Sequence, residues 1–431
     1  MAVPTKTDVL VVGGGPAGSC AATELARRGY DVVLIDKQHH PRETVGESVL
    51  PSAWKYFDLL GVTDEVEKNF VKKAGGIVAW GDEITEIAFR DFSYTRPGLH
   101  VERAELDHLL LQNAKKNGAR VWEGVKAESF ATAPDGSAEV TISAASGGAR
   151  HPLACRYFID ASGQASFVAQ QLGCRRLDDD FRFVSLWGYF NDSRYVSSGG
   201  VVRAFEEIPQ HPPMTFISRL GGWGWAWHIP LKRDTSVGIV VPVEDYKRGI
   251  AEHGSLEAYF LATCKATEYL RALLENASLT DGRVRIMRDY SYLPDQVAGA
   301  NYFIAGDAAG FVDPIFSIGV VIALYSGYLA AWAIDRSLRL PARADASREL
   351  FETQMRGRYE LARTMALPGV EAAAPEGAKT YFDFFSKAEK ELMWSAASMT
   401  TRSGNLVRAS NSRGAPPVLK RRQLSGLLFP G

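Results

Sequence analysis

The chain has 431 residues, of which 46% are hydrophobic and 23% are charged, as is typical of a globular protein with a sizeable core. These values exclude a mostly disordered chain, a collagen-like fibre and a small disulfide-stapled scaffold. Lys and Arg number 49 against 50 Asp and Glu, which gives a formal net charge of -1. A global electrostatic grip on nucleic acid is therefore not expected, because phosphate binding usually requires a basic excess.

The cysteines are scattered along the chain and form no CxxC pair; they are Cys20, Cys155, Cys174 and Cys264. This spacing indicates neither a zinc site nor a disulfide framework, so no metal is expected and the predicted location is the reducing cytoplasm. The first residues, MAVPTKTDVLVVGGG, lack the layout of a signal peptide.

The chain opens with a strand, a helix and a second strand. Asp8 to Val12 is a short apolar run that stops at three glycines, Ser19 to Arg28 is typical of a closely packed helix, and Asp31 to Ile35 is a second apolar run. This βαβ order predicts a parallel sheet covered by helices.

The middle of the chain predicts a second sheet, because residues 75–101 and 182–242 are rich in Trp, Tyr, Phe, Val and Thr. A helix is expected over 102–117. Strands that return to the first sheet are expected over 138–142, 157–159 and 302–305. The predicted fold is α/β, with a discontinuous Rossmann-like cofactor domain (1–74, 102–181 and 285–340), a β-rich substrate domain (75–101 and 182–284) and a helical C-terminal segment (341–431).

Two stretches near the C-terminus allow two interpretations each. Pro314 to Ile334 carries no charge and is long enough to span a bilayer, but a helix buried in a large core is favoured, and no membrane contact is expected. After Glu391 the chain has basic but no acidic residues. This tail is either a solvated surface or a docking site for an acidic partner.

A dinucleotide-binding turn follows the first strand. Gly13, Gly15 and Gly18, with Pro16 and Ala17 between them, form a GxGxxG pattern that opens a helix. The glycines allow a tight turn, close approach of a pyrophosphate and close helix packing, and the helix N-terminus favours the phosphate charge. The second strand ends at Asp36 and Lys37, where an acid is expected to accept hydrogen bonds from a ribose.

Three further positions favour FAD over NAD. Gly306 and Asp307 follow a predicted strand and resemble the GD motif of the FAD-dependent monooxygenases related to p-hydroxybenzoate hydroxylase. The resemblance implies that Asp307 binds the flavin ribityl chain, that Arg103 lies near the flavin phosphates and that Asp160 belongs to the cofactor site. Asp307 is also suited to cap a helix, which is the structural alternative.

Three motifs resemble those of flavin-dependent halogenases. The first is Gly224 to Pro230, GWAWHIP, which matches GWxWxIP with Trp225, Trp227 and Pro230. The second is Gly46 to Pro51, GESVLP, which resembles the loop along the flavin and assigns Glu47 and Ser48 to the cofactor. The alternatives are an aromatic core strand for the first motif and a surface carboxylate for Glu47.

The third motif is Phe311 to Gly319, FVDPIFSIG, which resembles the FxxPxxSxG element beside the isoalloxazine. The resemblance implies flavin contacts from Pro314 and Gly319. It also implies a halide site formed by Ser317, Ile318 and Gly319, where backbone N–H groups at a helix N-terminus suit an anion.

The chain departs from the family pattern at two positions. Phe316 stands where tryptophan halogenases carry a glutamate, which favours the phenol- and pyrrole-type halogenases. Ile318 stands where those enzymes usually have a second Ser or Thr, so halide affinity or choice is expected to differ.

A single lysine is the expected catalytic residue. Phe70 to Gly75, FVKKAG, resembles the family segment FxxKxG and places Lys73 between flavin and substrate, whereas Lys72 points elsewhere. Taken without the resemblance, a Lys-Lys pair is more often a solvated surface feature.

The resemblance implies an enzyme of secondary metabolism, such as antibiotic biosynthesis. It would halogenate a phenol or pyrrole, free or bound to a carrier protein, with FADH2, O2 and chloride or bromide. Reaction would run through a C4a-hydroperoxyflavin and hypohalous acid, and a separate flavin reductase would supply the reduced flavin. Candidates for the aromatic lining of the substrate pocket are Trp80, Trp187, Tyr189 and Phe216, and plain core packing is the alternative for most of them.

Two other functions stay open at this stage. An aromatic monooxygenase of the same fold would hydroxylate its substrate without halide. A catalytically silent flavin-binding protein would bind FAD without turnover.

Overall fold

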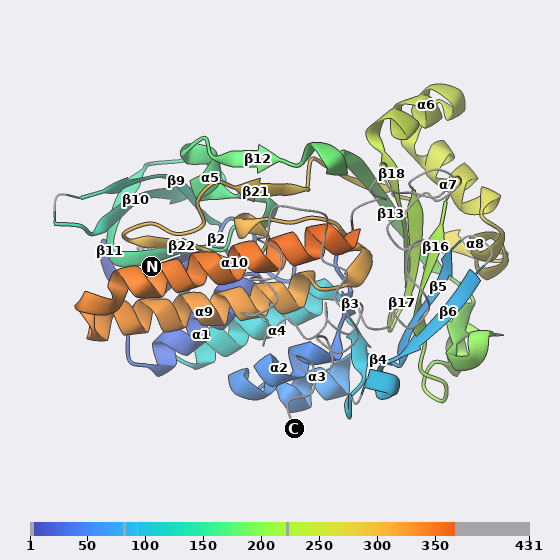
Figure 1. Ribbon diagram of the computed structural model, residues 1–431, viewed down its shortest axis with the longest axis horizontal. Coiled ribbons are helices and arrows are strands. Elements are labelled where there is room, and N and C mark those ends of the chain that lie inside the picture. The colour runs from blue at the N-terminus through green and yellow to red at the C-terminus, as the bar shows by residue number, and fades with distance from the viewer. Residues whose placement is uncertain (1–3, 81–82, 93, 134, 221–223, 367–431) are drawn as a thin grey trace, which may run out of the picture.

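The computed structural model describes residues 4–80, 83–92, 94–133, 135–220 and 224–366. The structure has a mixed α/β architecture around two large sheets, with layers of helices against them (Figure 1). The basic tail expected after Glu391 lies outside the described residues.

The first sheet contains the N-terminal strands and is largely parallel. Its spatial order is β8 (Arg120–Glu123), β2 (Val32–Asp36), β1 (Lys6–Val12), β11 (His151–Asp160), β10 (Ala138–Ala144) and β9 (Val125–Thr132), with β22 (Tyr302–Ile304) also paired to β11. The central strand β1 pairs in parallel with β2 and β11, and its interior residues are fully buried. Burial on both faces explains the continuous apolar runs of the sequence.

Helices cover this sheet. Helix α9 (Gly319–Arg339) packs between α1 (Pro16–Arg27) and α10 (Ala344–Ala366), while α4 (Arg103–Lys116) lies on the other side of α1 (Figure 1). Close contact between α1 and α9 depends on Gly327, where a Cβ would lie 2.2 Å from the carbonyl oxygen of Ala17. The uncharged stretch that begins at Pro314 is therefore a buried core helix over most of its length. In the described part of the chain, we find no helix with the length and apolar character that a membrane span requires.

The second sheet is predominantly antiparallel. Its spatial order is β19 (Ser278–Leu279), β13 (Phe183–Asn191), β18 (Thr235–Pro242), β17 (Trp225–Pro230), β16 (Met214–Arg219), β5 (Gly75–Trp80) and β6 (Glu83–Ala88), with β20 (Arg285–Arg288) also paired to β13. The helices of this half are α6 (Val243–His253), α7 (Leu256–Ala266) and α8 (Glu268–Leu273). The sequence predicted that the cofactor domain resumes at residue 285. In the structure, the strand that begins there, β20, pairs with β13 of the second sheet.

A small sheet and two strand pairs complete the strand arrangement. The small sheet has the order β3 (Ser48–Val49), β7 (Gly98–His100) and β4 (Val71–Lys73). Its antiparallel register sets Ser48 opposite His100 and Lys73 opposite Gly98. The strand pairs are β12 (Arg175–Leu177) with β21 (Tyr292–Pro294), and β14 (Tyr195–Ser197) with β15 (Val201–Arg203). Three short helices, α2 (Trp54–Leu60), α3 (Thr63–Asn69) and α5 (Phe167–Gln171), fill the connections.

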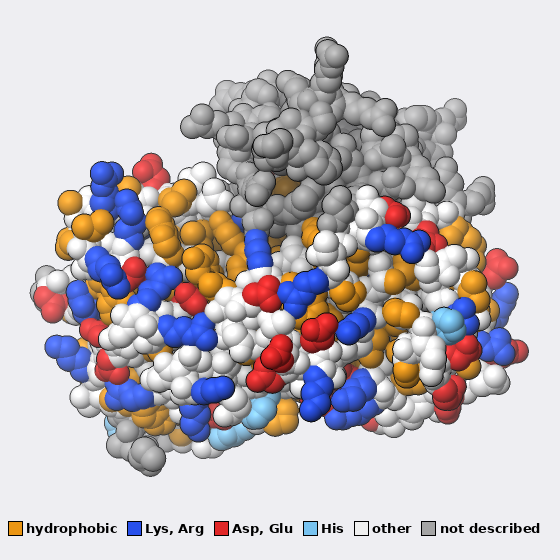
Figure 2. All heavy atoms as spheres, turned by 90° about the horizontal axis from the view of Figure 1, so that it is seen from below, with side chains coloured by type: hydrophobic (Ala, Val, Ile, Leu, Met, Phe, Trp, Pro, Cys, Tyr) orange, Lys and Arg blue, Asp and Glu red, His pale blue; other side chains and the backbone are white. Residues whose placement is uncertain are grey.

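Surface charges are mixed in sign. On the face seen in Figure 2, Lys and Arg side chains lie among Asp and Glu side chains. Side chains of opposite charge also pair across the fold, and the guanidinium of Arg363 on α10 donates from Nε to Asp178 at 2.6 Å. This interspersion agrees with the near-zero formal charge of the sequence.

Candidate active site

A cavity of about 870 Å³ is lined by residues of both large sheets. This volume falls within the range of small-molecule and cofactor sites. Most of the site residues predicted from the sequence line it: Gly13, Gly15, Pro16, Ala17, Asp36, Lys37, Glu47, Ser48, Arg103, Trp225, Trp227, Gly306, Asp307, Pro314, Ser317 and Gly319.

One end of the cavity is formed by the glycine turn after β1. Gly13 has φ +110°, and a Cβ there would lie 2.2 Å from the carbonyl oxygen of Ala161. At the end of β2, the Asp36 carboxylate accepts a hydrogen bond from the backbone N–H of Gly14 at 2.7 Å. The turn therefore presents bare backbone and the N-terminus of α1 to the cavity, which is how this motif receives a pyrophosphate.

Cationic side chains border the same end. Arg42 lies 3.7 Å from Asp107 and 4.0 Å from Asp36, and its buried Nε has no hydrogen-bond partner among the described residues. Arg103, the first residue of α4, donates from Nε to Asp107 at 2.9 Å and from Nη1 to the carbonyl oxygen of Val45 at 2.7 Å. A guanidinium with an unused donor beside a glycine turn suits the phosphates of a dinucleotide.

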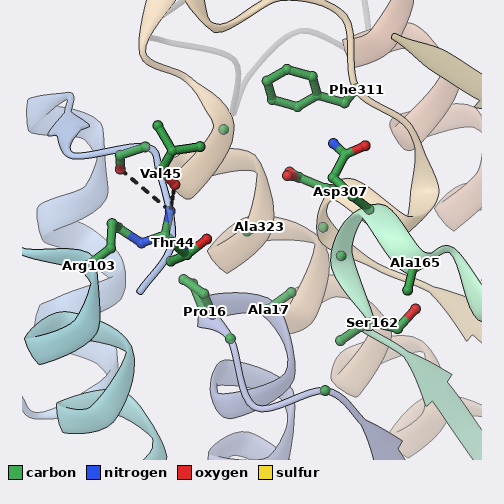
Figure 3. A pocket seen from close by; sticks show the side chains of 18 of the residues that line it. Pro16, Ala17, Thr44, Val45, Arg103, Ser162, Ala165, Asp307, Phe311 and Ala323 are labelled. Atoms are coloured by element: carbon green, nitrogen blue, oxygen red, sulfur yellow. Dashed lines mark hydrogen bonds between the residues drawn. The ribbon is translucent and has the colours of Figure 1, made fainter. Parts of the chain in front are cut away.

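Asp307 faces the cavity from the side opposite Arg103 (Figure 3). Burial raises the pKa of this carboxyl, and the positive charge of Arg103 opposes that shift. Asp307 lies inside the short 3-10 helix Gly306–Ala309 and does not cap it, so the alternative helix-capping role is not observed.

Five predicted site residues do not line the cavity: Gly18, Lys73, Asp160, Pro230 and Ile318. Gly18 packs against the turn itself, since a Cβ there would lie 1.9 Å from the carbonyl oxygen of Gly13. The carboxylate of Asp160 accepts from the backbone N–H groups of Ser162 and Val168 at 3.0 and 2.8 Å. It therefore fixes the chain after β11, and its assignment to the cofactor site stays a prediction.

The other end of the cavity is aromatic. Trp225, Trp227 and Ile229 alternate along β17 and all face the cavity. The two indole rings lie 5.7 Å apart, and Trp227 donates from Nε1 to Ser236 at 3.1 Å. These bulky side chains, each about 5% exposed, exclude water from this end.

The segment expected to bind halide adjoins the aromatic end. Pro314–Phe316 is a short 3-10 helix, Ser317 adopts a left-handed conformation with φ +57°, and α9 begins at Gly319. The carboxyl of Asp313, which also receives a hydrogen bond from Trp225, accepts from Ile315 N at 3.0 Å, and burial raises its pKa to about 7. The backbone turn thus presents the N-terminus of α9 toward the cavity.

The adjacent lysines of β4 have opposite environments. Lys72 forms a 3.5 Å ion pair with Glu67 at the surface, whereas Lys73 is 1% exposed. Its Nζ donates to the hydroxyl of Ser48 at 2.6 Å and lies 5.4 Å from the centre of the Phe89 ring. Burial lowers the pKa of Lys73 to about 7. Because Ser48 lines the cavity, the amine lies one hydrogen bond behind the cavity wall.

Most of the aromatic residues expected to line the substrate pocket do not line the cavity. Phe216 lies on the opposite face of β16 from Thr215 and Ile217, and it is these two that line the cavity. Trp187 does not line it, and the side chain of Trp80 lies outside the described residues.

Tyr189, another of the expected lining residues, does not line the cavity and contacts Glu47 instead. Its hydroxyl donates to the buried carboxylate of Glu47 at 2.8 Å. Burial raises the pKa of Glu47, and this hydrogen bond opposes the shift. Glu47 is thus a buried carboxylate, and the surface alternative is wrong.

Sequence reasoning missed Arg42, Thr215 and Tyr290, all of which line the cavity. Arg42 lies six positions after Asp36, and its proximity to that acid was an available signal. Thr215 and Tyr290 carry no motif, and only the folded sheet brings them to the site.

Comparisons with known proteins agree with this geometry. Residues 6–366 match the family model described as an FAD binding domain. A tryptophan 2-halogenase of Chondromyces crocatus is 33% identical over 362 residues, which cover 83% of this chain and 67% of that protein. The flavin-dependent halogenase armH3 of Armillaria mellea is 35% identical over 356 residues, covering 78% of this chain and 69% of that protein.

The chain belongs to the flavin-dependent halogenase family. The structure of the myxobacterial chondrochloren halogenase CndH aligns with a TM-score of 0.76 and 27% identity, covering 99% of this chain and 96% of that chain. The matched part of this halogenase spans about two thirds of its curated relatives. As a member of the family it is an FAD-dependent oxidoreductase, and the unpartnered Nε of Arg42, with the bare turn at Gly13, fits that cofactor.

Proposed function

We propose that the protein halogenates an electron-rich aromatic ring in natural-product biosynthesis, with reduced FAD, O2 and chloride or bromide. The favoured ring is a phenol or a pyrrole, either free or attached to a carrier protein. The observation that carries the proposal is the buried amine of Lys73, which lies 2.6 Å from a hydroxyl of the cavity wall.

We assign cofactor binding to one end of the cavity and the halogen chemistry to the other. Gly13, Arg42 and Arg103 hold the phosphates, Asp36 accepts from the ribose, and Asp307 contacts the ribityl chain. When bound, reduced FAD would activate O2, which is the oxidant: the flavin and the halide would each give up two electrons to it, and the halide would become hypohalous acid.

Halide binds at the start of α9. The backbone N–H groups of Ile318 and Gly319 have no acceptor within the helix, so they are free to hold an anion. The indoles of Trp225 and Trp227 exclude water near this point, which slows the loss of hypohalous acid to solvent.

Lys73 transfers the halogen. Its neutral amine attacks the halogen of hypohalous acid, so that an N–X bond forms and water leaves after proton transfer. The ring carbon then takes the halogen from nitrogen and loses its proton, which restores the amine. A pKa of about 7 keeps a large part of Lys73 in the neutral form at neutral pH.

A separate flavin reductase is the expected partner. The sequence contains a single GxGxxG pattern, at Gly13 to Gly18, and the same cavity end accounts for FAD. We infer that reduced flavin arrives from another protein.

Mass spectrometry of product mixtures tests the proposal. Phenols, pyrroles and indoles, free and carrier-bound, are incubated with protein, FAD, a flavin reductase, NADH, O2 and chloride or bromide. Indoles are included because one relative is a tryptophan 2-halogenase. A halogen isotope pattern that needs the protein, disappears in Lys73→Ala and survives in Lys72→Ala supports the proposal.

Other results would reject it. A gain of one oxygen without halide dependence would identify an aromatic hydroxylase. Full activity of Lys73→Ala would remove that amine from the reaction. Bound FAD with no turnover across the panel would favour a silent flavin-binding protein.

A further inference from the structure

A continuous chain of buried polar side chains extends from Lys73 into the protein. Lys73 Nζ lies 2.6 Å from Ser48 Oγ, which lies 3.2 Å from Thr215 Oγ1. Thr215 Oγ1 lies 2.8 Å from His100 Nε2, and His100 Nδ1 lies 2.8 Å from the carbonyl oxygen of Pro230. We call these four side chains, Lys73, Ser48, Thr215 and His100, the polar chain.

The fold isolates the polar chain from bulk water. Its members come from β4, β3, β16 and β7, and their exposed fractions are 1%, 7%, 3% and 0% in the order Lys73, Ser48, Thr215, His100. Ser48 and Thr215 also line the cavity, whereas His100 does not. Groups buried so deeply are expected to exchange protons with one another more readily than with solvent.

The acceptor at the far end fixes the direction of every hydrogen bond. The Pro230 carbonyl can only accept, so His100 carries its hydrogen on Nδ1. In the neutral ring, Nε2 is then an acceptor, and Thr215 donates to it. Thr215 in turn accepts from Ser48, and Ser48 accepts from Lys73. All donors therefore point from the amine toward the imidazole.

The titratable groups that face His100 are Lys73 and His228. Burial lowers the pKa of His228 to about 3, so it stays neutral across the working range of pH. Burial and the charge of Lys73 hold the pKa of His100 well below its ordinary value. Since both ends resist a second charge, the polar chain holds at most one excess proton.

We propose that His100 is the proton acceptor for Lys73, reached through the hydroxyls of Thr215 and Ser48. One proton moves along each hydrogen bond: Lys73 gives a proton to Ser48, Ser48 gives its own to Thr215, and Thr215 gives its own to Nε2 of His100. Lys73 becomes a neutral amine and His100 an imidazolium, and no other reactant is needed. Reversal of the shift returns the proton.

The role of the relay in catalysis rests on the proposed function, because the proposed halogen transfer requires a neutral Lys73. Below about pH 7 most of the lysine is protonated before reaction. The relay carries that proton to His100 only transiently, against the lower pKa of the imidazole, while the neutral amine reacts. Above about pH 8 the lysine is already neutral, and the relay becomes dispensable.

The test breaks the relay at its middle member. Thr215→Val keeps the shape of the side chain and removes the hydroxyl, whereas Thr215→Ser restores a hydroxyl. The matched control is Ser193→Ala, because Ser193 forms a 2.7 Å hydrogen bond with another buried histidine, His228, that lies outside the polar chain. Halogenation rates are measured from about pH 6 to pH 9 with a substrate found in the panel above.

We expect Thr215→Val to lose at least about 10-fold in rate at pH 6 and less than about 3-fold at pH 9, within the usual range of proton-transfer effects. Thr215→Ser and Ser193→Ala should keep the wild-type pH profile. A loss of the same factor at every pH would overturn the proposal, because it would show that Thr215 only supports the structure.

Nitrogen NMR of 15N-histidine protein gives a readout that needs no turnover. We expect His100 as the Nδ1–H tautomer, and we expect Lys73→Met to raise the pH at which His100 titrates. The Nε2–H tautomer, or a His100 titration that Lys73→Met leaves unchanged, would overturn the proposal. If no ring is halogenated but both NMR results hold, the proposed function fails while the relay stands.

Discussion

The two ends of the cavity use charge in opposite ways. At the glycine turn, side chains of opposite charge form close ion pairs, as Arg103 does with Asp107 at 2.9 Å. At the aromatic end, burial pushes the pKa of both Lys73 and Asp313 to about 7, so that each is partly neutral at neutral pH. The contrast teaches that one protein can offer ion pairs beside a charged cofactor and, by burial, keep an amine partly neutral a short distance away.

The largest effect is expected from a substitution in the glycine turn at the ionic end of the cavity. Gly13→Ala places a Cβ 2.2 Å from the Ala161 carbonyl at a backbone φ of +110°. We expect FAD affinity to fall at least about 100-fold, or the chain to lose its fold, because backbone must shift on both sides. Flavin retained after desalting measures the first effect, and circular dichroism measures the second.

A second glycine provides the control. At Gly76 a Cβ would meet its nearest neighbour at 3.5 Å, which is ordinary contact. Gly76→Ala should therefore keep the flavin. Normal flavin retention by Gly13→Ala would show that the turn tolerates a side chain.

The next largest effect is expected at the aromatic end, where one substitution should abolish activity and yet raise stability. Folding lowers the pKa of Lys73 from 10.5 to about 7, a burial penalty of at most about 5 kcal/mol at pH below 7. Lys73→Met should abolish halogenation yet raise the free energy of unfolding at pH 6 by about 2–4 kcal/mol, because no charge is then buried. Urea unfolding of the protein without FAD measures the gain.

The buried Lys73 should also make the stability of the wild-type protein depend on pH. Between about pH 7 and 10.5 the unfolded lysine holds a proton that the folded lysine has lost, so raising the pH stabilises the folded state. Lys72→Met, at a half-exposed position, should change stability by less than about 0.5 kcal/mol. A loss of stability in Lys73→Met at pH 6 would show that its charge is well solvated.

The carboxyl of Asp313 should give the opposite slope. Its pKa is raised from 3.8 to about 7, so between these values the folded state holds a proton that the unfolded state has lost. Stability should therefore fall by up to about 4 kcal/mol as the pH rises from 4 to 7. Asp313→Asn should flatten this part of the curve, as followed by urea unfolding at several pH values. An unchanged slope would place the carboxyl in contact with water.

The smallest effect concerns the border between the two ends, where the Tyr189 hydroxyl donates to Glu47 at 2.8 Å. At a pH at which Glu47 is ionised, Tyr189→Phe should lower the free energy of unfolding by about 1.5–3 kcal/mol, the usual range for a hydrogen bond to a charged group. Tyr195 donates to a neutral backbone carbonyl, that of His211, at 2.7 Å, and Tyr195→Phe should lose only about 1 kcal/mol. Equal losses would indicate that Glu47 is protonated at the pH of the measurement.

Much of the ionic end could be predicted because its determinants are local. The turn from Gly13 to Gly18 and the acid at Asp36 lie within one βαβ unit, and a short stretch of chain fixes their geometry. Asp160 also follows a strand of the first sheet. The sequence did not show that its carboxylate accepts hydrogen bonds from two backbone N–H groups eight or fewer positions ahead.

The aromatic end was predicted only in part. The resemblance to GWxWxIP singled out Trp225 and Trp227, and both line the cavity, whereas on β16 the sequence analysis favoured Phe216 over Thr215 and Ile217. Hydrophobicity cannot choose between the two faces of a strand when both are buried. The pairing of β16 with β5 and β17 makes that choice.

The sequence by itself determined the cofactor fold and the dinucleotide turn, because both are set by a short motif that acts through neighbouring backbone. It also singled out Lys73, by a motif resemblance, as the lysine that we propose to be reactive. Only the tertiary structure decided that Lys73 is buried while Lys72 is half exposed, and that Ser48, Thr215 and His100 join it in one hydrogen-bonded chain. These partners lie on different strands, up to 167 positions apart. Their protonation depends on burial and distance, which exist only once the sheets have packed.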